Sequence, residues 1–213
     1  MRWLDERGLS FVDLLVGSAI GLVIAAGAVV VVRSQTLAMR TSAGQLDMND
    51  AARGVVEFMT REIRMAGYNP RCLNPSPVTA VVAAGPQVLR VQYDLNENGV
   101  LDTGTAASED VLYEYDAASE SLRRTVGGEV STLAMDVPAD GFQIRYFDQS
   151  GLELVGTGPG GALSTGPSSQ AEAVRRLSLR FAPAKAADAR TATTVSASLW
   201  TNVSLRNLEY RCQ

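Results

Sequence analysis

The chain has 213 residues, 46% of them hydrophobic, and a formal net charge of −4. A chain of this length can bury the core of one globular domain and still supply an extended segment. Its acidic balance gives no basic footprint for direct binding of a nucleic acid. Because the sequence contains no histidine, histidine general bases, histidine-activated nucleophiles and histidine-ligated zinc are excluded.

The first predicted element is a long apolar helix at residues 9–32. Asp13 is the single charged residue in this run, and Arg33 follows its last residue. Such a helix measures about 36 Å, enough to cross the hydrocarbon core of a membrane. A cleaved secretory signal fits poorly, because its apolar core is shorter and a small-residue cleavage site follows it. An ordinary signal anchor fits the length but leaves Asp13 unexplained, since a carboxylate in lipid is costly and marks function.

The start of this run reads Arg7-Gly8-Leu9-Ser10-Phe11-Val12-Asp13. This motif resembles the class III signal of type IV pilins. The resemblance implies that residues 1–8 are a leader, that prepilin peptidase cleaves after Gly8, and that the new amino terminus at Leu9 is methylated. It also gives Asp13 a role in assembly, as the acidic residue fifth in the mature chain. The family usually has Phe first and Glu fifth, so Leu9 and Asp13 are departures from its pattern.

The helical pattern continues through residues 33–67 in amphipathic form. Apolar residues recur three or four positions apart over 48–66, and charged residues such as Glu62 fill much of the other side. Gly67 is placed to end the helix. A membrane helix followed by a coiled-coil stalk is the alternative, but the apolar stripe is too short for sustained heptads.

Residues 59–68 close this helix with the sequence Met-Thr-Arg-Glu-Ile-Arg-Met-Ala-Gly-Tyr. They resemble the helix end of PilW-like minor pilins, and Trp200–Asn207 resembles the last strand of the same family. The resemblance implies a single-pass protein of the inner membrane with its head in the periplasm, which later enters the pilus filament or its tip. The implied partners are other minor pilins, the major pilin, prepilin peptidase and the inner-membrane assembly platform.

Residues 68–213 are predicted to form a β-rich head, which makes the fold class α+β. Several segments alternate apolar and polar residues, as half-buried strands do. The predicted strands are 78–82, 88–93, 111–115, 121–126, 142–147, 174–181 and 195–205. Turn-rich pieces separate them, including Gly127-Gly128 and a flexible loop at 156–169.

The chain has two cysteines, Cys72 and Cys212, too few for a zinc or iron–sulfur site. Behind a membrane-targeting segment, two cysteines indicate one disulfide in an oxidising compartment. The alternative is two unpaired buried thiols. A bond between Cys72 and Cys212 would tie the carboxyl terminus to the end of the helix.

A candidate Ca²⁺ loop lies in the head at residues 94–102, with the pattern D-x-N-x-N-G-x-x-D. This pattern matches the first nine positions of an EF-hand-type loop, in which alternate oxygen ligands converge on a hard cation. The candidate ligands are Asp94, Asn96, Asn98, the Val100 carbonyl and Asp102. The twelfth position is Thr105 instead of Glu, so Glu109 or Asp110 would have to supply a further carboxylate. The alternative is an Asn- and Gly-rich turn between strands.

The sequence therefore predicts a minor pilin of a type IV pilus, with a structural role and no catalytic one. In that family such subunits support filament initiation or the filament tip, and so motility, adhesion or DNA uptake. The nearest alternative is a pseudopilin of a type II secretion system, which shares the signal, helix and head. A signal-anchored periplasmic enzyme is the remote alternative.

Overall fold

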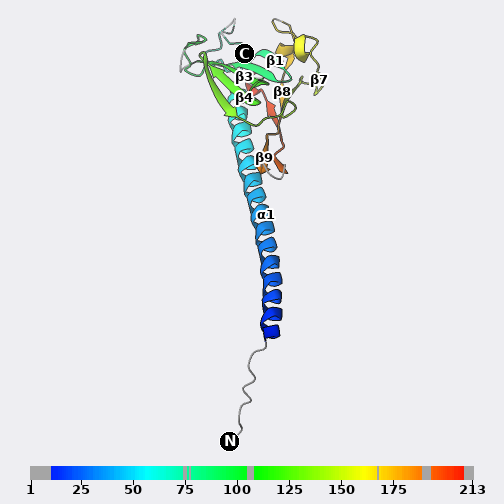
Figure 1. The fold of residues 1–213 in the computed structure, drawn as a ribbon. Coiled ribbons are helices and arrows are strands. Elements are labelled where there is room, and N and C mark those ends of the chain that lie inside the picture. Colours follow the sequence, from blue (N-terminus) through cyan, green and yellow to red (C-terminus); the bar gives the residue numbers. More distant parts are fainter. Residues whose placement is uncertain are drawn as a thin grey trace. The chain divides into compact units, whose positions relative to one another are not determined.

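The structure, a computed structural model, describes residues 11–73, 76, 78–104, 108–166, 168–188 and 193–208. The chain divides into two compact units, Met1–Gly44 and Gln45–Gln213. One long helix, α1 (Phe11–Met65), begins in the first unit and ends in the second (Figure 1). All the strands that the structure describes belong to the second unit, which is the head.

In the first unit, the side chains of α1 from Phe11 to Arg40 are exposed. Exposing a helix that is apolar around its whole circumference to water is unfavourable, so such a helix is stable only in lipid or among other apolar surfaces. The hydroxyl of Ser18 donates to the carbonyl of Leu15 at 2.9 Å, so this polar group is satisfied within the helix itself. Ser18 therefore adds little cost to placing this segment in an apolar environment.

In the second unit, one stripe of apolar side chains on α1 is buried in the core of the head. Ala52, Val56, Met59 and Ile63 are the buried residues of the helix, spaced three or four apart. Gly67 follows the helix with φ +77°, the left-handed conformation that a helix-ending glycine adopts without strain. The predicted helix and its terminating glycine are both confirmed over the described residues.

The first sheet of the head is a five-stranded antiparallel meander in the order β1-β2-β3-β4-β5. Its strands are β1 (Val81–Gly85), β2 (Val88–Gln92), β3 (Asp110–Asp116), β4 (Ser121–Val126) and β5 (Glu129–Ala134). Each strand follows its neighbour directly along the chain, so the connections are hairpins, except for the longer loop between β2 and β3. That loop contains the candidate cation ligands.

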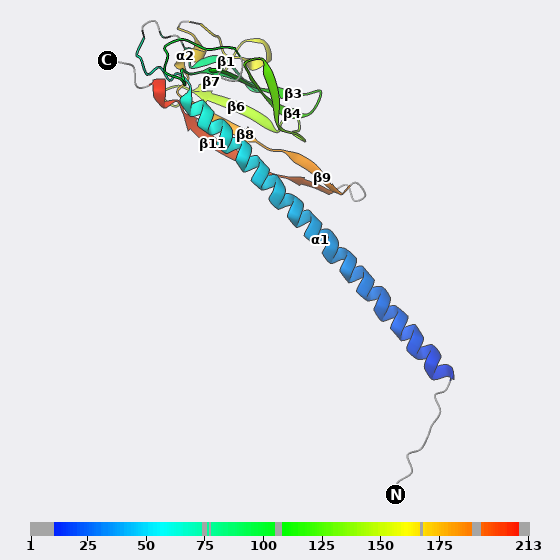
Figure 2. The ribbon, with the colours of Figure 1, turned by 90° about the vertical axis from the view of Figure 1, so that its left-hand side faces the viewer.

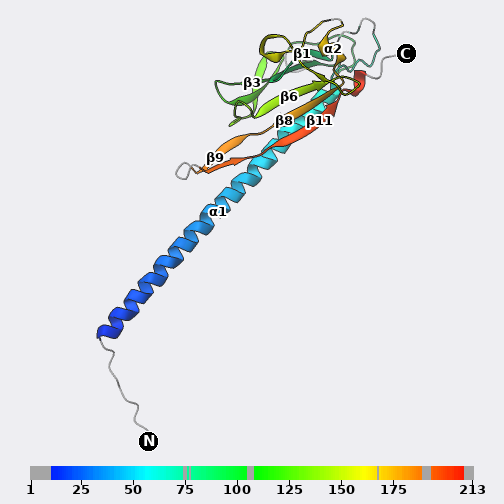
Figure 3. The same ribbon diagram turned by 90° about the vertical axis from the view of Figure 1, so that its right-hand side faces the viewer.

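The second sheet is antiparallel and has the order β11-β8-β6-β7, and a separate two-stranded ribbon pairs β10 with β9. The strands are β6 (Phe142–Phe147), β7 (Glu153–Leu154), β8 (Arg176–Phe181), β9 (Ala184–Asp188), β10 (Thr193–Ser196) and β11 (Leu199–Ser204). Figures 2 and 3 show β8 and β11 beside the last turns of α1. The Asn207 side-chain amide donates to the Arg64 carbonyl at 3.0 Å, which links the helix end to the segment after β11.

The core of the head lies where the end of α1 meets both sheets. Met59 and Ile63 belong to the same buried cluster as Leu89 and Tyr113 of the first sheet and Leu177 of the second. In β8 the burial alternates strictly along Arg176–Phe181, as expected of a strand with one face on a core. The predicted α+β fold, a long helix packed on antiparallel β-sheets, is confirmed.

The strand boundaries differ from the sequence prediction in two places. The predicted strand 78–82 lies later, as β1, and the predicted strand 195–205 divides into β10 and β11. The strands β5, β7 and β9 were not predicted. Strand β5 is mostly exposed, so it lacks the apolar alternation by which a sequence identifies a strand. The predicted turn at Gly127-Gly128 is confirmed: both glycines have positive φ, as in a tight hairpin between β4 and β5.

The loop predicted to be flexible at 156–169 is tied to the first sheet. It contains the short 3-10 helix η2 (Pro159–Gly161) and precedes the short helix α2 (Gln170–Ala173). Leu163 is buried, and its backbone N–H donates to the Ala84 carbonyl of β1 at 2.8 Å. A single buried leucine therefore anchors a glycine-rich segment whose composition alone indicates mobility.

The buried stripe of α1 predicts a large asymmetry between two substitutions in the same helix. Met59→Ala should lower the free energy of unfolding of the head by about 2–5 kcal/mol, because Met59 is buried in the core. Leu46→Ala is the matched control: Leu46 is 64% exposed, and its loss should change stability by less than about 0.5 kcal/mol. Denaturant unfolding of the full chain in detergent measures both, and equal effects would contradict the assignment of the buried face.

Candidate functional site

The apolar part of α1 is the first functional feature of the chain. Within the described residues, α1 is the helix that is long and apolar enough to cross a membrane, by length and composition. Phe11, Leu22 and Val23 are each 72% exposed. A continuous apolar surface of this kind marks a site of contact with lipid or with another protein. This feature fits a membrane-anchored protein.

Asp13 lies in the first turn of α1, the end at which a carboxylate is favoured by the helix dipole. Leu14 and Leu15 beside it are exposed apolar residues. Asp13 is therefore an acidic group within an apolar surface, as the sequence predicts. Gly8 and Leu9, the predicted processing residues, lie outside the described residues, so the cleavage site and the assembly role of Asp13 stay predictions.

The end of α1 is joined to the first sheet by an ion pair that the sequence interpretation missed. Arg124 of β4 donates to Glu62 of α1 through Nε at 2.9 Å and through Nη2 at 2.5 Å. The Tyr113 hydroxyl of β3 donates to the same carboxylate. The Arg124 guanidinium also lies over the ring of Phe58, 5.4 Å from its centroid. The prediction that Glu62 belongs to the polar outer side of the helix is wrong.

The cluster of Glu62, Tyr113 and Arg124 is largely shielded from water. The side chains of Glu62 and Arg124 are 16% and 20% exposed. Burial, together with the negative charge of Glu62, raises the pKa of Tyr113 far above its ordinary value. The same two causes raise the pKa of Tyr93 to about 12. A bidentate pair in this setting fixes the rotation of α1 against the sheet, because the fork of the guanidinium matches one carboxylate geometry.

Three of the candidate cation ligands contact one another in the loop between β2 and β3. Asp102 Oδ2 accepts hydrogen bonds from the side-chain amides of Asn96 at 2.6 Å and Asn98 at 3.0 Å. Asp94 Oδ2 accepts from the backbone N–H of Gly99 at 2.9 Å. Gly99 has φ +79°, so the sharp turn predicted at this glycine is present. The Val100 N–H donates to Asn98 Oδ1 at 2.7 Å.

Of the two acidic residues considered as supplements to this loop, one faces it and the other does not. Glu109 is buried and accepts from three backbone N–H groups, those of Leu95, Asn96 and Asp102. Asp110 instead forms an ion pair with Arg90 across β2 and β3. Among the described residues, no three His, Cys, Asp or Glu side chains are spaced to hold a metal by themselves. A cation here would therefore depend on amide and carbonyl oxygens as well.

The predicted disulfide lies at the edge of what the structure describes. Cys72 follows the end of α1 with φ +54°. Cys212 lies outside the described residues, so the pairing with Cys72 stays a prediction.

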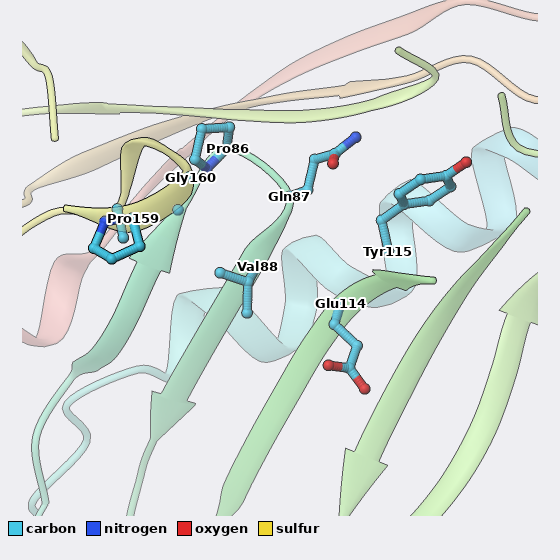
Figure 4. A pocket seen from close by; sticks show the side chains of 9 residues that line it. Pro86, Gln87, Val88, Glu114, Tyr115, Pro159 and Gly160 are labelled. Atoms are coloured by element: carbon cyan, nitrogen blue, oxygen red, sulfur yellow. The ribbon is translucent and has the colours of Figure 1, made fainter. Parts of the chain in front are cut away.

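A shallow pocket lies between the start of the first sheet and η2 (Figure 4). Pro86, Gln87 and Val88 line one part, and Pro159 and Gly160 line another. The lining contributes one carboxylate, that of Glu114, which points away from the ring of Tyr115 in Figure 4.

Comparison with known proteins gives one structural likeness. No family model matches the chain, and no curated protein matches it in sequence. Among solved structures, the chain is similar to a type IV-like pilin from Thermus thermophilus. The two share 12% sequence identity with a TM-score of 0.41, over 75% of this chain and 97% of the other. A likeness of this size carries no argument about function.

The shielded pair of Glu62 and Arg124 predicts a larger loss of stability than an exposed pair of the same type. Glu62→Gln should destabilise the head by about 2–4 kcal/mol, because it leaves the Arg124 guanidinium shielded without its charged partner. Glu153→Gln is the matched control. Its bidentate pair with Arg145 has side chains that are 34% and 51% exposed, so its loss should cost less than about 1 kcal/mol.

Denaturant unfolding of the two variants and the unmodified chain in detergent tests this difference. Equal losses, or a larger loss for Glu153→Gln, would contradict the structural role assigned to Glu62.

The raised pKa of Tyr93 predicts a loss of stability in alkali. In the unfolded chain a tyrosine titrates near about 10, whereas in the folded head Tyr93 keeps its proton up to about 12. Its contribution is therefore complete below about pH 10 and is lost as the pH rises toward 12. Between about pH 10 and 12, the free energy of unfolding of the Tyr93→Phe variant should fall by roughly 2 kcal/mol less than that of the unmodified chain. Parallel pH profiles for the two proteins would contradict the assignment.

Proposed function

We propose that this chain is a membrane-anchored pilin-like subunit of a type IV pilus, acting as a minor pilin in filament initiation or at the filament tip. The observation that carries the proposal is that the two parts of α1 have different surfaces. Its first part exposes a continuous apolar surface around one carboxylate, and its last part supplies Met59 and Ile63 to the core of a β-rich head. A subunit that is stored in a membrane and then packed into a filament needs both parts.

The proposed activity is packing, with no catalytic step. Before assembly, lipid covers the apolar part of α1, with the head in the periplasm. After assembly, the same side chains contact the helices of neighbouring pilins, including other minor pilins and the major pilin. Exchanging lipid for helix costs little, since both surroundings are apolar, so close packing and polar contacts decide the geometry.

The proposed register of assembly depends on Asp13. After prepilin peptidase removes residues 1–8, the amino group of Leu9 carries a positive charge at the start of the helix. A carboxylate alone in lipid is unfavourable, and pairing with the amino terminus of a neighbouring subunit offsets that cost. The pair can form at one axial offset between helices, so it selects that offset from the many that apolar contacts alone allow.

A pseudopilin of a type II secretion system is the second candidate. The apolar helix, the single carboxylate and the β-rich head are shared by both kinds of subunit, so these features do not separate them. Deletion of the gene distinguishes the two: loss of surface pili supports a minor pilin, and loss of protein secretion with intact pili supports a pseudopilin.

Amino-terminal processing is the first test of this proposal. In cells with prepilin peptidase, the intact mass of the membrane-extracted protein should correspond to a chain that starts at methylated Leu9. In cells that lack the peptidase, the mass should include residues 1–8. A Gly8→Ala variant serves as the control for cleavage. An uncut chain in peptidase-positive cells would refute the proposal.

Substitution of Asp13 tests the proposed register of assembly. Asp13→Asn should stay in the membrane fraction, since it removes a charge that lipid disfavours. The amount of the variant in sheared filaments should nevertheless fall at least about tenfold, because the ion pair with a neighbour's amino terminus is lost. Asp13→Glu keeps the charge and is the matched control. Quantitative immunoblots of both fractions measure this, and normal incorporation of Asp13→Asn would contradict the role of the carboxylate.

A further inference from the structure

The loop between β2 and β3 contains a buried carboxylate with one unpaired oxygen. Asp94 has no exposed surface. Its Oδ2 atom accepts from Gly99, whereas its Oδ1 atom is buried and has no hydrogen-bond partner. A buried, ionised oxygen without a partner is costly, so such an atom calls for a positive partner that protein groups do not supply.

Two hydrogen bonds hold Asp94 in place, one through its side chain and one through its backbone. The two oxygens of one carboxyl group are close neighbours, and Oδ2 contacts the loop backbone at Gly99. The backbone N–H of Asp94 donates to the Tyr68 carbonyl at 2.9 Å, which joins the start of the loop to the segment after α1. The position of Asp94 Oδ1 is therefore fixed by the residue's own backbone and by its sister oxygen.

The Lys and Arg side chains that the structure describes form no ion pair with the carboxylates of this loop. Asp94, Asp102 and Glu109 all contribute carboxylates to it, and none of the three forms an ion pair with a Lys or Arg among the described residues. The nearby Arg71 directs its Nε to the Glu97 carbonyl at 2.6 Å. Three carboxylates without a basic partner attract a divalent cation.

The other candidate ligands with oxygen-bearing side chains, Asn96, Asn98 and Asp102, lie a few residues after Asp94 in the sequence. The NH2 groups of Asn96 and Asn98 both donate to Asp102 Oδ2, which brings these three side chains together. Glu109 holds the loop backbone in place through three N–H groups and so prearranges these donors. The loop therefore contains the carboxylate and amide groups that a calcium site uses, and Glu109 supports its backbone.

We propose that the loop binds one Ca²⁺ ion through Asp94 Oδ1, the side chains of Asn96, Asn98 and Asp102, and the Val100 carbonyl. The ion would neutralise Asp94 and Asp102. Calcium suits this loop better than magnesium, because Ca²⁺ accepts irregular sets of carboxylate, amide and carbonyl oxygens, whereas Mg²⁺ requires near-octahedral geometry and keeps its waters.

Binding would stabilise the connection between α1 and the head. The end of β2 and the loop hold the segment after the helix through three contacts besides that of Asp94. The Gly67 N–H donates to the Gln92 carbonyl at 2.8 Å, the Tyr68 hydroxyl donates to Glu97 at 2.9 Å, and Arg71 donates to the Glu97 carbonyl. A cation that orders the loop therefore also orders residues 67–71. This inference does not depend on the proposed role in a filament.

Calcium titration of the full chain in detergent tests the inference. Isothermal titration should show one Ca²⁺ per chain, and Mg²⁺ should bind much more weakly. Excess Ca²⁺ over EGTA should raise the Tm of the head by roughly 5–10 °C, because a ligand that binds only the folded state stabilises it. Asp94→Asn should weaken Ca²⁺ binding by roughly 100-fold, since ligand charge sets the affinity of such loops.

Two measurements keep a folding defect apart from a binding defect. In EGTA, Asp94→Asn should be at least as stable as the unmodified chain, because it removes an uncompensated buried charge. Asp148→Asn is the matched control, since Asp148 also accepts from turn groups, including the Leu152 N–H at 2.9 Å, but should leave Ca²⁺ affinity unchanged. Absence of binding heat and of a Tm shift at millimolar Ca²⁺ would overturn the inference and would assign a buried water to Asp94 Oδ1. An equal effect of Asp148→Asn would overturn it as well.

Discussion

One helix of this protein has to satisfy two different surroundings. The early residues of α1 expose an apolar surface on every side, and Ala52, Val56, Met59 and Ile63 bury a single stripe against two sheets. The first pattern is stable in lipid or among other helices, and the second is stable against a protein core. The remaining structure follows from this constraint, because the head must complete the buried stripe while the other part stays available.

The ion pair of Glu62 and Arg124 shows how the head meets this constraint. Apolar contacts along α1 allow the helix to rotate or slide by small amounts with little loss of buried area. The bidentate pair, whose Glu62 carboxylate also accepts a hydrogen bond from the Tyr113 hydroxyl, has one geometry. It therefore selects one rotation of the helix against the first sheet. Hydrophobic burial thus supplies the free energy of packing, and the polar cluster supplies its specificity.

The loop between β2 and β3 extends the same logic to the end of the helix. Gly67 ends α1 and donates to Gln92 at the end of β2, and the Tyr68 carbonyl accepts from Asp94 at the start of the loop. A bound cation would hold this connection at the point where the helix gives way to the sheet. The early part of α1 and the loop would then have separate tasks, one in association and one in the order of the head.

Much of the architecture could be predicted because its signals are local. An apolar run around one carboxylate, an amphipathic stripe and Gly67 together define α1, and the D-x-N-x-N-G pattern locates the loop. Prediction failed where the physical cause is distant in sequence. Glu62 looks like a solvent-facing residue until β3 and β4 bring Tyr113 and Arg124 to it, and no local pattern in the glycine-rich segment shows that Leu163 bonds to Ala84.

The sequence by itself determined the α+β fold class, the apolar helix with Asp13 and the candidate ligands of the loop, since composition and periodicity are properties of neighbouring residues. Only the tertiary structure decided which charged side chains are shielded. It turned Glu109 into the loop and Asp110 toward Arg90, although the two are adjacent in the chain. The reason is that successive residues at the start of a strand point to opposite sides, and only the packed sheets define what each side meets.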